Sequence, residues 1–89
     1  MIVKDQVHLQ YDKKYDILYI DIGEPCAAYS DEIDDGIYLR INPKTEKAVG
    51  VTIFSYKSKP IEKIAKTIHL PIDWIDINRR VDNIINKYK

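Results

Sequence analysis

Residues 11–22 read Tyr-Asp-Lys-Lys-Tyr-Asp-Ile-Leu-Tyr-Ile-Asp-Ile, and this stretch decides the fold of the 89-residue chain. Apolar residues alternate with other residues on both sides of its polar segment 12–16, at Val7, Leu9, Tyr11, Leu18, Ile20 and Ile22. Such a two-residue period is typical of strands with one buried face, and the polar segment has the composition of a turn. The stretch therefore predicts a hairpin with strands over residues 7–11 and 16–22, whose apolar face another part of the chain must cover.

Three further strands are expected after Gly23-Glu24-Pro25, which should interrupt the sheet because proline cannot donate to a strand ladder. Residues 26–33 predict a third, partly polar strand, which Asp34-Asp35-Gly36 ends as a turn. The inward residues of the fourth and fifth strands, which Asn42-Pro43-Lys44-Thr45 separates, are Ile37, Leu39, Ile41, Val49, Val51 and Ile53. Gly50, inside the fifth strand, predicts a bulge or a close backbone contact.

The apolar period changes from two to nearly four after residue 60, which indicates helices. A first helix should begin after Pro60 and end at Leu70-Pro71, with an apolar stripe of Ile61, Ile64, Ala65 and Ile68. A second should begin at the N-cap residue Asp73, with Ile72 packing on Ile77 as a hydrophobic staple. Its apolar stripe comprises Trp74, Ile77, Val81, Ile84 and Tyr88, with Ile75 and Ile85 beside them.

Five strands followed by two helices predict an α+β fold, in which an antiparallel meander carries both helices on one face. A chain of this length makes one domain, with the sheet over residues 7–56 and a helical tail over residues 60–89. Its single cysteine, Cys26, excludes an intrachain disulfide and a multi-cysteine metal site. No apolar run of about 20 residues and no basic, then apolar, leader is present, so we expect a soluble cytoplasmic protein without a membrane partner.

The net charge of zero is a cancellation between two parts of the chain. Residues 1–36 hold three basic and nine acidic residues, a net charge of −6, and residues 37–89 hold eleven and five, a net charge of +6. The two parts either lie on opposite surfaces or neutralise each other within the fold.

Aromatic residues give the first candidate binding surface. Tyr19, Tyr38, Phe54 and Tyr56 have the parity opposite to the aliphatic residues, interleaved with Asp21, Arg40 and Thr52. One interpretation is that these residues form cross-strand aromatic pairs on a solvated face. The alternative is that they form a contact surface for a partner, because tyrosine is enriched at protein interfaces.

The helical tail gives a second candidate, through either its apolar stripe or its charge. The spacing from Trp74 to Tyr88 covers only two heptads, too few for a coiled coil, so docking on the chain's own sheet is the default and docking on a second copy or another protein the alternative. Basic residues at Lys57, Lys59, Lys63, Lys66, Arg79, Arg80, Lys87 and Lys89 suggest nucleic-acid binding. The sequence pI of about 6.7 does not favour it.

The acidic run 31–36 is the densest group of carboxylates, and hard cations bind such oxygen ligands. It does not fit a calcium loop, because Ile33 and Asn42 fall at ligand positions, and a solvated turn is the simpler interpretation. His8 and His69 lie far apart in the sequence, and neither pairs predictably with Cys26 as nucleophilic catalysis requires. We therefore predict no metal, no cofactor and no catalytic residue.

Four pieces of the chain, in order, resemble a family of short bacterial and archaeal proteins catalogued as a domain of unknown function. They are Tyr11-Asp12 with Asp16 and Leu18-Tyr19-Ile20, Ser30 with Glu32, Gly36-Ile37 with Leu39, and Val49-Gly50-Val51 with Ile53. The pattern is Tyr-Asp-x-x-x-Asp-x-Leu-Tyr-Ile, and the resemblance covers residues 7–56. It implies a small α+β sheet domain with no assigned activity. Some such proteins resemble companions of small toxin genes, which implies an antitoxin-like role.

Together these observations predict a homodimeric module that binds and occludes another protein and is not an enzyme. Its binding surface is expected among Tyr19, Tyr38, Arg40, Phe54, Tyr56, Trp74, Ile77, Val81 and Ile84. The alternatives are a nucleic-acid-binding accessory protein that uses the basic tail and, third, a small metal-dependent enzyme.

Overall fold

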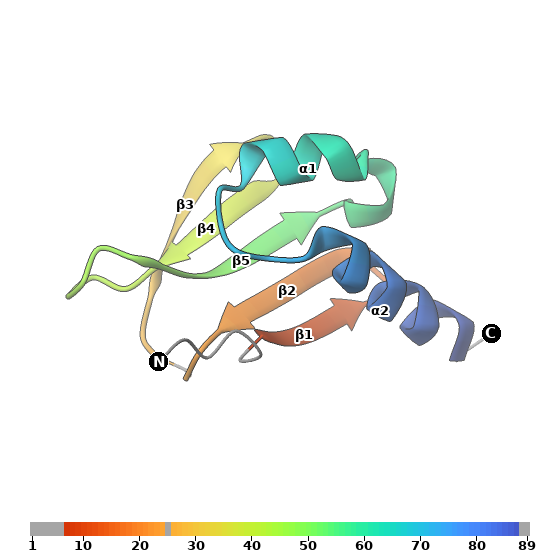
Figure 1. The fold of residues 1–89 in the computed structure, drawn as a ribbon, viewed down its shortest axis with the longest axis horizontal. Coiled ribbons are helices and arrows are strands. Elements are labelled where there is room, and N and C mark those ends of the chain that lie inside the picture. The colour runs from red at the N-terminus through yellow and green to blue at the C-terminus, as the bar shows by residue number, and fades with distance from the viewer. Residues whose placement is uncertain (1–6, 25, 88–89) are drawn as a thin grey trace.

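A computed structural model describes residues 7–24 and 26–87, which form a five-stranded antiparallel sheet and two α-helices (Figure 1). The elements are β1 (Val7–Asp12), β2 (Ile17–Ile22), β3 (Tyr29–Asp34), β4 (Ile37–Ile41), β5 (Ala48–Phe54), the 3-10 helix η1 (Tyr56–Ser58), α1 (Ile61–Thr67) and α2 (Trp74–Lys87). The predicted α+β fold is therefore confirmed. The predicted lead-in 1–6, the sheet-breaking Pro25 and the last stripe residue, Tyr88, lie outside the described residues.

The strand order is β1-β2-β5-β4-β3, which puts β5 at the centre of the sheet. β3, β4 and β5 follow one another as a meander, and the β1–β2 hairpin joins them through pairing of β2 with β5. In this register Ile20 and Leu39 lie on opposite sides of Val51. The aliphatic residues of three strands therefore meet in one row.

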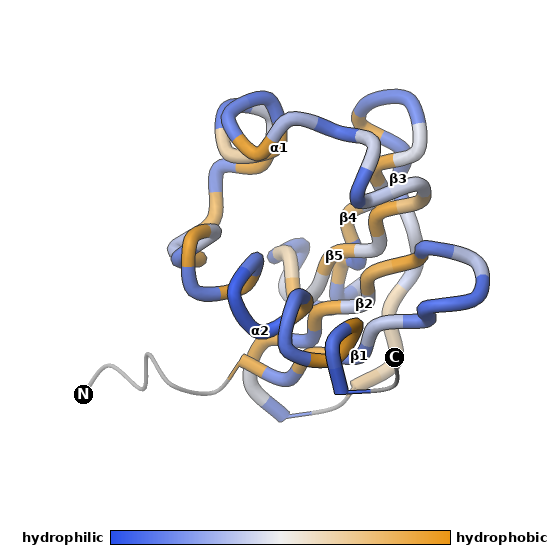
Figure 2. The backbone as a smooth tube through the Cα atoms, turned by 90° about the vertical axis from the view of Figure 1, so that its right-hand side faces the viewer, coloured by the Kyte–Doolittle hydropathy of each residue, from blue (hydrophilic) through white to orange (hydrophobic). Residues whose placement is uncertain are grey.

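The predicted parity is confirmed for most strand residues, because their aliphatic side chains face the helices. Ile41 and Val49, next to the register shift between β4 and β5, belong neither to the core nor to the side chains packed against it. Both helices lie on the same side of the sheet (Figure 2). The core that forms between the two layers consists of Leu18, Ile20, Ile37, Val51, Ile53, Tyr56, Ile64, Ile68, Trp74, Ile77 and Val81. Burial of these side chains is the main favourable term for folding, at about 1.5 to 3 kcal/mol for each large aliphatic residue.

Both helices begin where the sequence predicts. Pro60 immediately precedes α1, and the Asp73 carboxylate caps α2 by accepting the backbone N–H groups of Ile75 at 3.1 Å and Asp76 at 3.2 Å. The predicted end of α1 is wrong, because the helix stops at Thr67, and Ala65 is exposed instead of belonging to the apolar stripe. Neither helix in the described ranges is long and apolar enough to cross a membrane.

Ile75 lies outside the apolar stripe of α2, contrary to the prediction. Its side chain is 81% exposed, whereas that of Ile77 is 2% exposed. Two residues along an α-helix rotate by about 200°, so these neighbours in the sequence point in nearly opposite directions. Only one of them can face the sheet.

The prediction that Tyr56 shares the face of Tyr38 is also wrong. Ser55 has a left-handed backbone conformation with φ 53°, which ends the strand and turns the chain into η1. Tyr56 is thereby placed among the core residues on the helix side. The two-residue period of β5 cannot be extended past Phe54.

Candidate functional site

The face of the sheet opposite the helices is the first candidate site, and we call it the open face. It carries the side chains with the parity opposite to the core. Tyr19, Thr52 and Tyr38 are neighbours across β2, β5 and β4, and Asp21, Gly50 and Arg40 form the adjacent row. The structure thus brings together Tyr19, Tyr38, Arg40 and Phe54, four of the residues that the sequence proposes for binding.

The aromatic side chains of the open face remain accessible to a partner. Phe54 is 43% exposed and Tyr19 is 38% exposed, although both are large apolar residues. Tyr38 packs edge-on against Phe54, with ring centroids 5.6 Å apart and an interplanar angle of 66°. This geometry is favourable for an aromatic pair, and it holds both rings in place on the surface.

A shallow hollow of about 290 Å³ lies beside the aromatic residues. Its lining comprises Gln10, Tyr19, Ile20, Asp21, Ser30, Arg40, Val51 and Thr52, contributed by all five strands. These side chains offer hydrogen-bond donors and acceptors next to the aromatic rings. The hollow could therefore take a polar side chain of a bound protein while the rings contact an apolar one.

Gly50 forms part of the sheet beneath the ion pair of Asp21 and Arg40. A Cβ atom at Gly50 would lie 2.6 Å from the carbonyl oxygen of Ile20 and 3.1 Å from the Asp21 carboxylate. The predicted close backbone contact is therefore confirmed, and the ladder between β4 and β5 has a register shift next to it, between Arg40 and Ile41. Asp21 accepts a hydrogen bond from Arg40, so the two charges on this part of the face offset each other.

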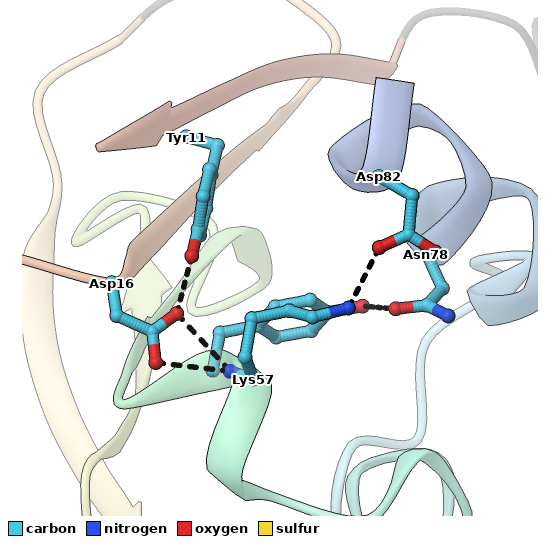
Figure 3. Close-up of polar contacts among 6 residues, drawn as sticks. Tyr11, Asp16, Lys57, Asn78 and Asp82 are labelled. Carbon is cyan, nitrogen blue, oxygen red and sulfur yellow. Dashed lines mark hydrogen bonds and ion pairs between the residues drawn. The ribbon is translucent and has the colours of Figure 1, made fainter. Parts of the chain in front are cut away.

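A polar network on the helix side begins with Tyr11 and Asp16 (Figure 3). The Tyr11 hydroxyl donates to the Asp16 carboxylate at 2.5 Å, and the backbone N–H of Lys57 donates to both carboxylate oxygens at 3.1 Å. Asp16 itself has φ 55° at the end of the hairpin turn. The five-residue separation of Tyr11 and Asp16 thus has a structural role, because it closes the β1–β2 turn on the segment after β5.

The same network continues to α2. The Tyr56 hydroxyl donates to Asn78 Oδ1 at 3.0 Å, and Lys57 Nζ lies 2.7 Å from the Asp82 carboxylate. Burial raises the pKa of Tyr56 to about 12, and burial with the adjacent Asp16 carboxylate raises the pKa of Tyr11 above its ordinary value. Both tyrosines are therefore protonated near pH 7, and the network acts as a connection between the sheet and α2.

The helical residues proposed for binding lie in other surroundings. Trp74, Ile77 and Val81 belong to the core, and Ile84 is half-buried. The default interpretation, docking of this stripe on the chain's own sheet, holds for the three core residues. They are not accessible to a partner in this fold.

Many of the basic residues in the tail have intramolecular partners. Lys57 pairs with Asp82, Arg79 and Arg80 both pair with Asp76, and Lys59 donates to the carbonyl oxygen of Phe54. Lys63 Nζ lies 3.9 Å from the Asp34 carboxylate. This contact and the ion pair of Asp21 with Arg40 each join the acidic first part of the chain to the basic second part, so the two parts neutralise each other locally.

Two carboxylates of the acidic run 31–36 accept hydrogen bonds from backbone groups of the same turn. The Asp34 carboxylate accepts the backbone N–H of Asp35 at 2.8 Å, and the Glu32 carboxylate accepts that of Gly36 at 3.4 Å. Within residues 7–24 and 26–87, no three His, Cys, Asp or Glu side chains are arranged to hold a metal ion. Cys26 is exposed and lies near Asn42, with 3.8 Å between its Sγ and Asn42 Nδ2.

The family match covers nearly the whole sheet and the part of the polar network before α1, which includes Tyr11, Asp16 and Tyr56. The family described as "Protein of unknown function (DUF2283)" matches residues 8–57, more than half of the chain. A search of the curated proteins and a search of the solved structures each find no match. The matched segment contains Asp16, Tyr38 and Phe54 but neither α1 nor α2. The chain therefore belongs to this family of proteins of unknown function, DUF2283.

Proposed function

We propose that this protein is a non-catalytic module that binds another protein through the open face of its sheet. The observation that supports the proposal is the aromatic group of exposed Tyr19 and Phe54 with half-buried Tyr38, next to a polar hollow on the face that lies opposite α1 and α2. Aromatic residues are enriched among the residues that dominate binding energy at protein interfaces. A rigid sheet also presents them without an ordering cost at the moment of binding.

The chemistry of the face favours a protein partner over a nucleic acid. Arg40 is paired with Asp21, so this region offers little free positive charge for phosphate groups. Its aromatic rings and uncharged polar groups match a partner surface with one or two apolar side chains flanked by hydrogen-bonding groups. In its finer form the proposal is occlusion, in which the open face covers a working surface of the partner, as an antitoxin-like protein would.

The test is affinity capture from the organism that encodes the chain, with matched variants of two exposed apolar residues. Phe54→Ser removes the most exposed ring of the open face, and Ile75→Ser removes an exposed side chain on α2, away from the sheet. We expect a stoichiometric partner to be retained by the wild-type protein and by Ile75→Ser, and to be lost with Phe54→Ser. Equal retention by both variants would contradict the proposal.

Light scattering on the same three proteins tests the predicted homodimer separately. A dimer that persists in Phe54→Ser is compatible with a partner on the open face, because the two copies then associate elsewhere. A dimer that becomes a monomer only in Phe54→Ser would instead place a second copy on the open face. That result would contradict the assignment of this face to a different protein.

A further inference from the structure

The outer edge of β3 is a second place where this fold can accept a partner. β3 is the last strand in the order β1-β2-β5-β4-β3, so β4 is its one neighbour in the sheet (Figure 1). Its residues from Tyr29 to Ile33 are all exposed. No helix or loop of the described chain makes a backbone hydrogen bond to this edge.

The direction of the free backbone groups follows from the pairing of β4. The backbone N–H of Phe54 donates to the carbonyl oxygen of Gly36 at 2.8 Å, so Gly36 directs its hydrogen-bonding groups toward β5. Successive residues of a strand alternate between their two neighbours. Leu39 is therefore bonded to β3, through its partner Asp31.

The same alternation in β3 directs the intervening residues outward. Ser30 and Glu32 oppose Arg40 and Tyr38 but lie in the positions that do not bond to β4. Each leaves one N–H donor and one C=O acceptor at the outer edge. The register shift between Glu32 and Asp34 ends this regular segment, so the edge offers a short two-residue site for an added strand.

The charge at this edge specifies which kind of strand could be added. Asp31, Glu32, Asp34 and Asp35 lie in or directly after β3, and among the described residues one contact at 3.9 Å, from Lys63 to Asp34, opposes them. A second copy of β3 would place carboxylates next to carboxylates, which is destabilising between adjacent strands. A basic strand would place cations there instead.

We propose that the outer edge of β3 accepts a short, extended, basic segment of another protein as a sixth strand. The backbone groups of Ser30 and Glu32 supply the hydrogen bonds, and the carboxylates of Asp31 and Glu32 select lysine or arginine in the incoming segment. Such strand addition takes affinity from the main chain and specificity from alternate side chains. Because the Ser30 side chain also lines the hollow of the open face, the added strand would extend that face.

The probe for this proposal is a synthetic peptide of about nine residues with alternating lysine and threonine, long enough to span the edge of β3. The ¹⁵N-labelled full chain is titrated with the peptide, and the amide signals are followed by NMR. We expect the signals of Ser30 and Glu32 to shift and their amide protons to exchange at least several-fold more slowly. A matched peptide with glutamate in place of lysine should leave them unchanged, and added salt should weaken binding by the lysine peptide.

Two variant pairs separate the backbone contribution from the charge. Ser30→Pro removes an outward donor that the sheet does not use, a substitution that edge strands tolerate, whereas Ser30→Ala keeps the donor. Ser30→Pro should weaken peptide binding at least tenfold and Ser30→Ala by less than about twofold, in line with the loss of one buried hydrogen bond. Glu32→Gln should weaken binding and reduce its dependence on salt, whereas Asp12→Asn at the opposite end of the sheet should not.

Binding of both peptides with shifts confined to the open face, or equal binding by Ser30→Pro and Ser30→Ala, would overturn the proposal. So would the absence of binding by the lysine peptide, in which case the acidic residues of β3 serve only to keep copies of the sheet from pairing at their edges. The Phe54→Ser variant should bind the peptide normally. Failure of the open-face proposal is thus distinguishable from failure at the β3 edge.

Discussion

Asp16 joins the hairpin turn to two other segments of the chain, β1 and η1. Its side chain accepts hydrogen bonds from Tyr11 in β1 and from the backbone of Lys57 in η1, while its own carbonyl oxygen accepts the N–H of Tyr56 at 3.1 Å. Its positive φ is also one that aspartate tolerates better than most residues with a side chain. Both its backbone conformation and its hydrogen bonds therefore explain why an aspartate occupies the end of the hairpin turn.

We predict that Asp16→Ala lowers the free energy of unfolding by about 2 to 4 kcal/mol, because hydrogen bonds to a charged acceptor are lost and alanine is disfavoured at this φ. Asp16→Asn keeps an acceptor and the backbone preference, and should cost roughly half as much. Asp12→Ala is the matched control, since Asp12 accepts one exposed bond, from the N–H of Tyr15. Urea denaturation measures all three. A loss for Asp12→Ala as large as for Asp16→Ala would contradict the special role of Asp16.

Tyr56 makes the stability of the protein sensitive to alkaline pH. Its pKa in the folded state is about 12, against an ordinary value of 10.0, chiefly because the ring is buried. The folded state therefore holds this proton more tightly than the unfolded state does. The stabilisation is fully present below about pH 10 and is lost as the pH rises toward 12.

Tyr56→Phe should flatten this dependence. Between pH 10 and 12 the wild-type free energy of unfolding should fall with an extra slope of up to about 1.4 kcal/mol per pH unit from Tyr56, measured by urea denaturation followed by circular dichroism. The variant lacks the titrating hydroxyl, so its slope should be smaller, whereas lysine titration affects both proteins alike. Identical slopes for the wild type and Tyr56→Phe would show that Tyr56 has the same pKa in the folded and unfolded states, which would contradict the prediction.

At the scale of elements, the period of the apolar residues predicts which face of each strand is buried. The alternation of Leu18 and Ile20, or of Val51 and Ile53, identifies the buried face of each strand and places Tyr38 and Phe54 on the other face, because a strand has a fixed period of two. Tyr56 escapes this rule, since the chain reverses at Ser55. The polar strand β3 is predicted less well, because both of its sides are exposed and no period results.

Other features depend on contacts that no local pattern contains. The strand order requires β2 to pair with β5 across the intervening residues 23–47, and the choice among such pairings is set by the whole sheet. The ion pair of Asp21 and Arg40 across Gly50 depends on the same pairing. The sequence does contain a signal for this ion pair, because Asp21 and Arg40 have opposite charges and share one predicted face. It contains no signal that Gln10 and Ser30 line the hollow.

The two faces of α2 should differ strongly in their response to truncation of an isoleucine. Ile77→Ala removes a core side chain and should cost about 2 to 5 kcal/mol, as is usual for buried isoleucine. Ile75→Ala removes an exposed side chain from the same turn and should change stability by less than about 0.5 kcal/mol. Thermal melting of the two variants measures the difference. Similar melting temperatures would contradict the orientation of α2.

At the scale of the whole molecule, the protein consists of two layers that share one core. The sheet contributes Leu18, Ile20, Ile37, Val51 and Ile53, and the segment after β5 contributes the remainder of the core. The two layers also divide the surface into the helix side, where many charges are paired, and the open face and β3 edge, where aromatic rings and free backbone groups remain. Association is therefore expected on the sheet side, while the helices serve the core.

Removal of both helices tests this division of roles. A chain that ends at Lys59 keeps the whole sheet but loses Ile64, Ile68, Trp74, Ile77 and Val81, about half of the core. The exposed aliphatic face of the sheet would then be a large apolar patch, of the kind that causes aggregation. We expect size-exclusion chromatography with light scattering to show aggregates for the truncated chain. A well-folded monomer would instead show that the helices are an association element, and the search for a partner would move from the open face to α2.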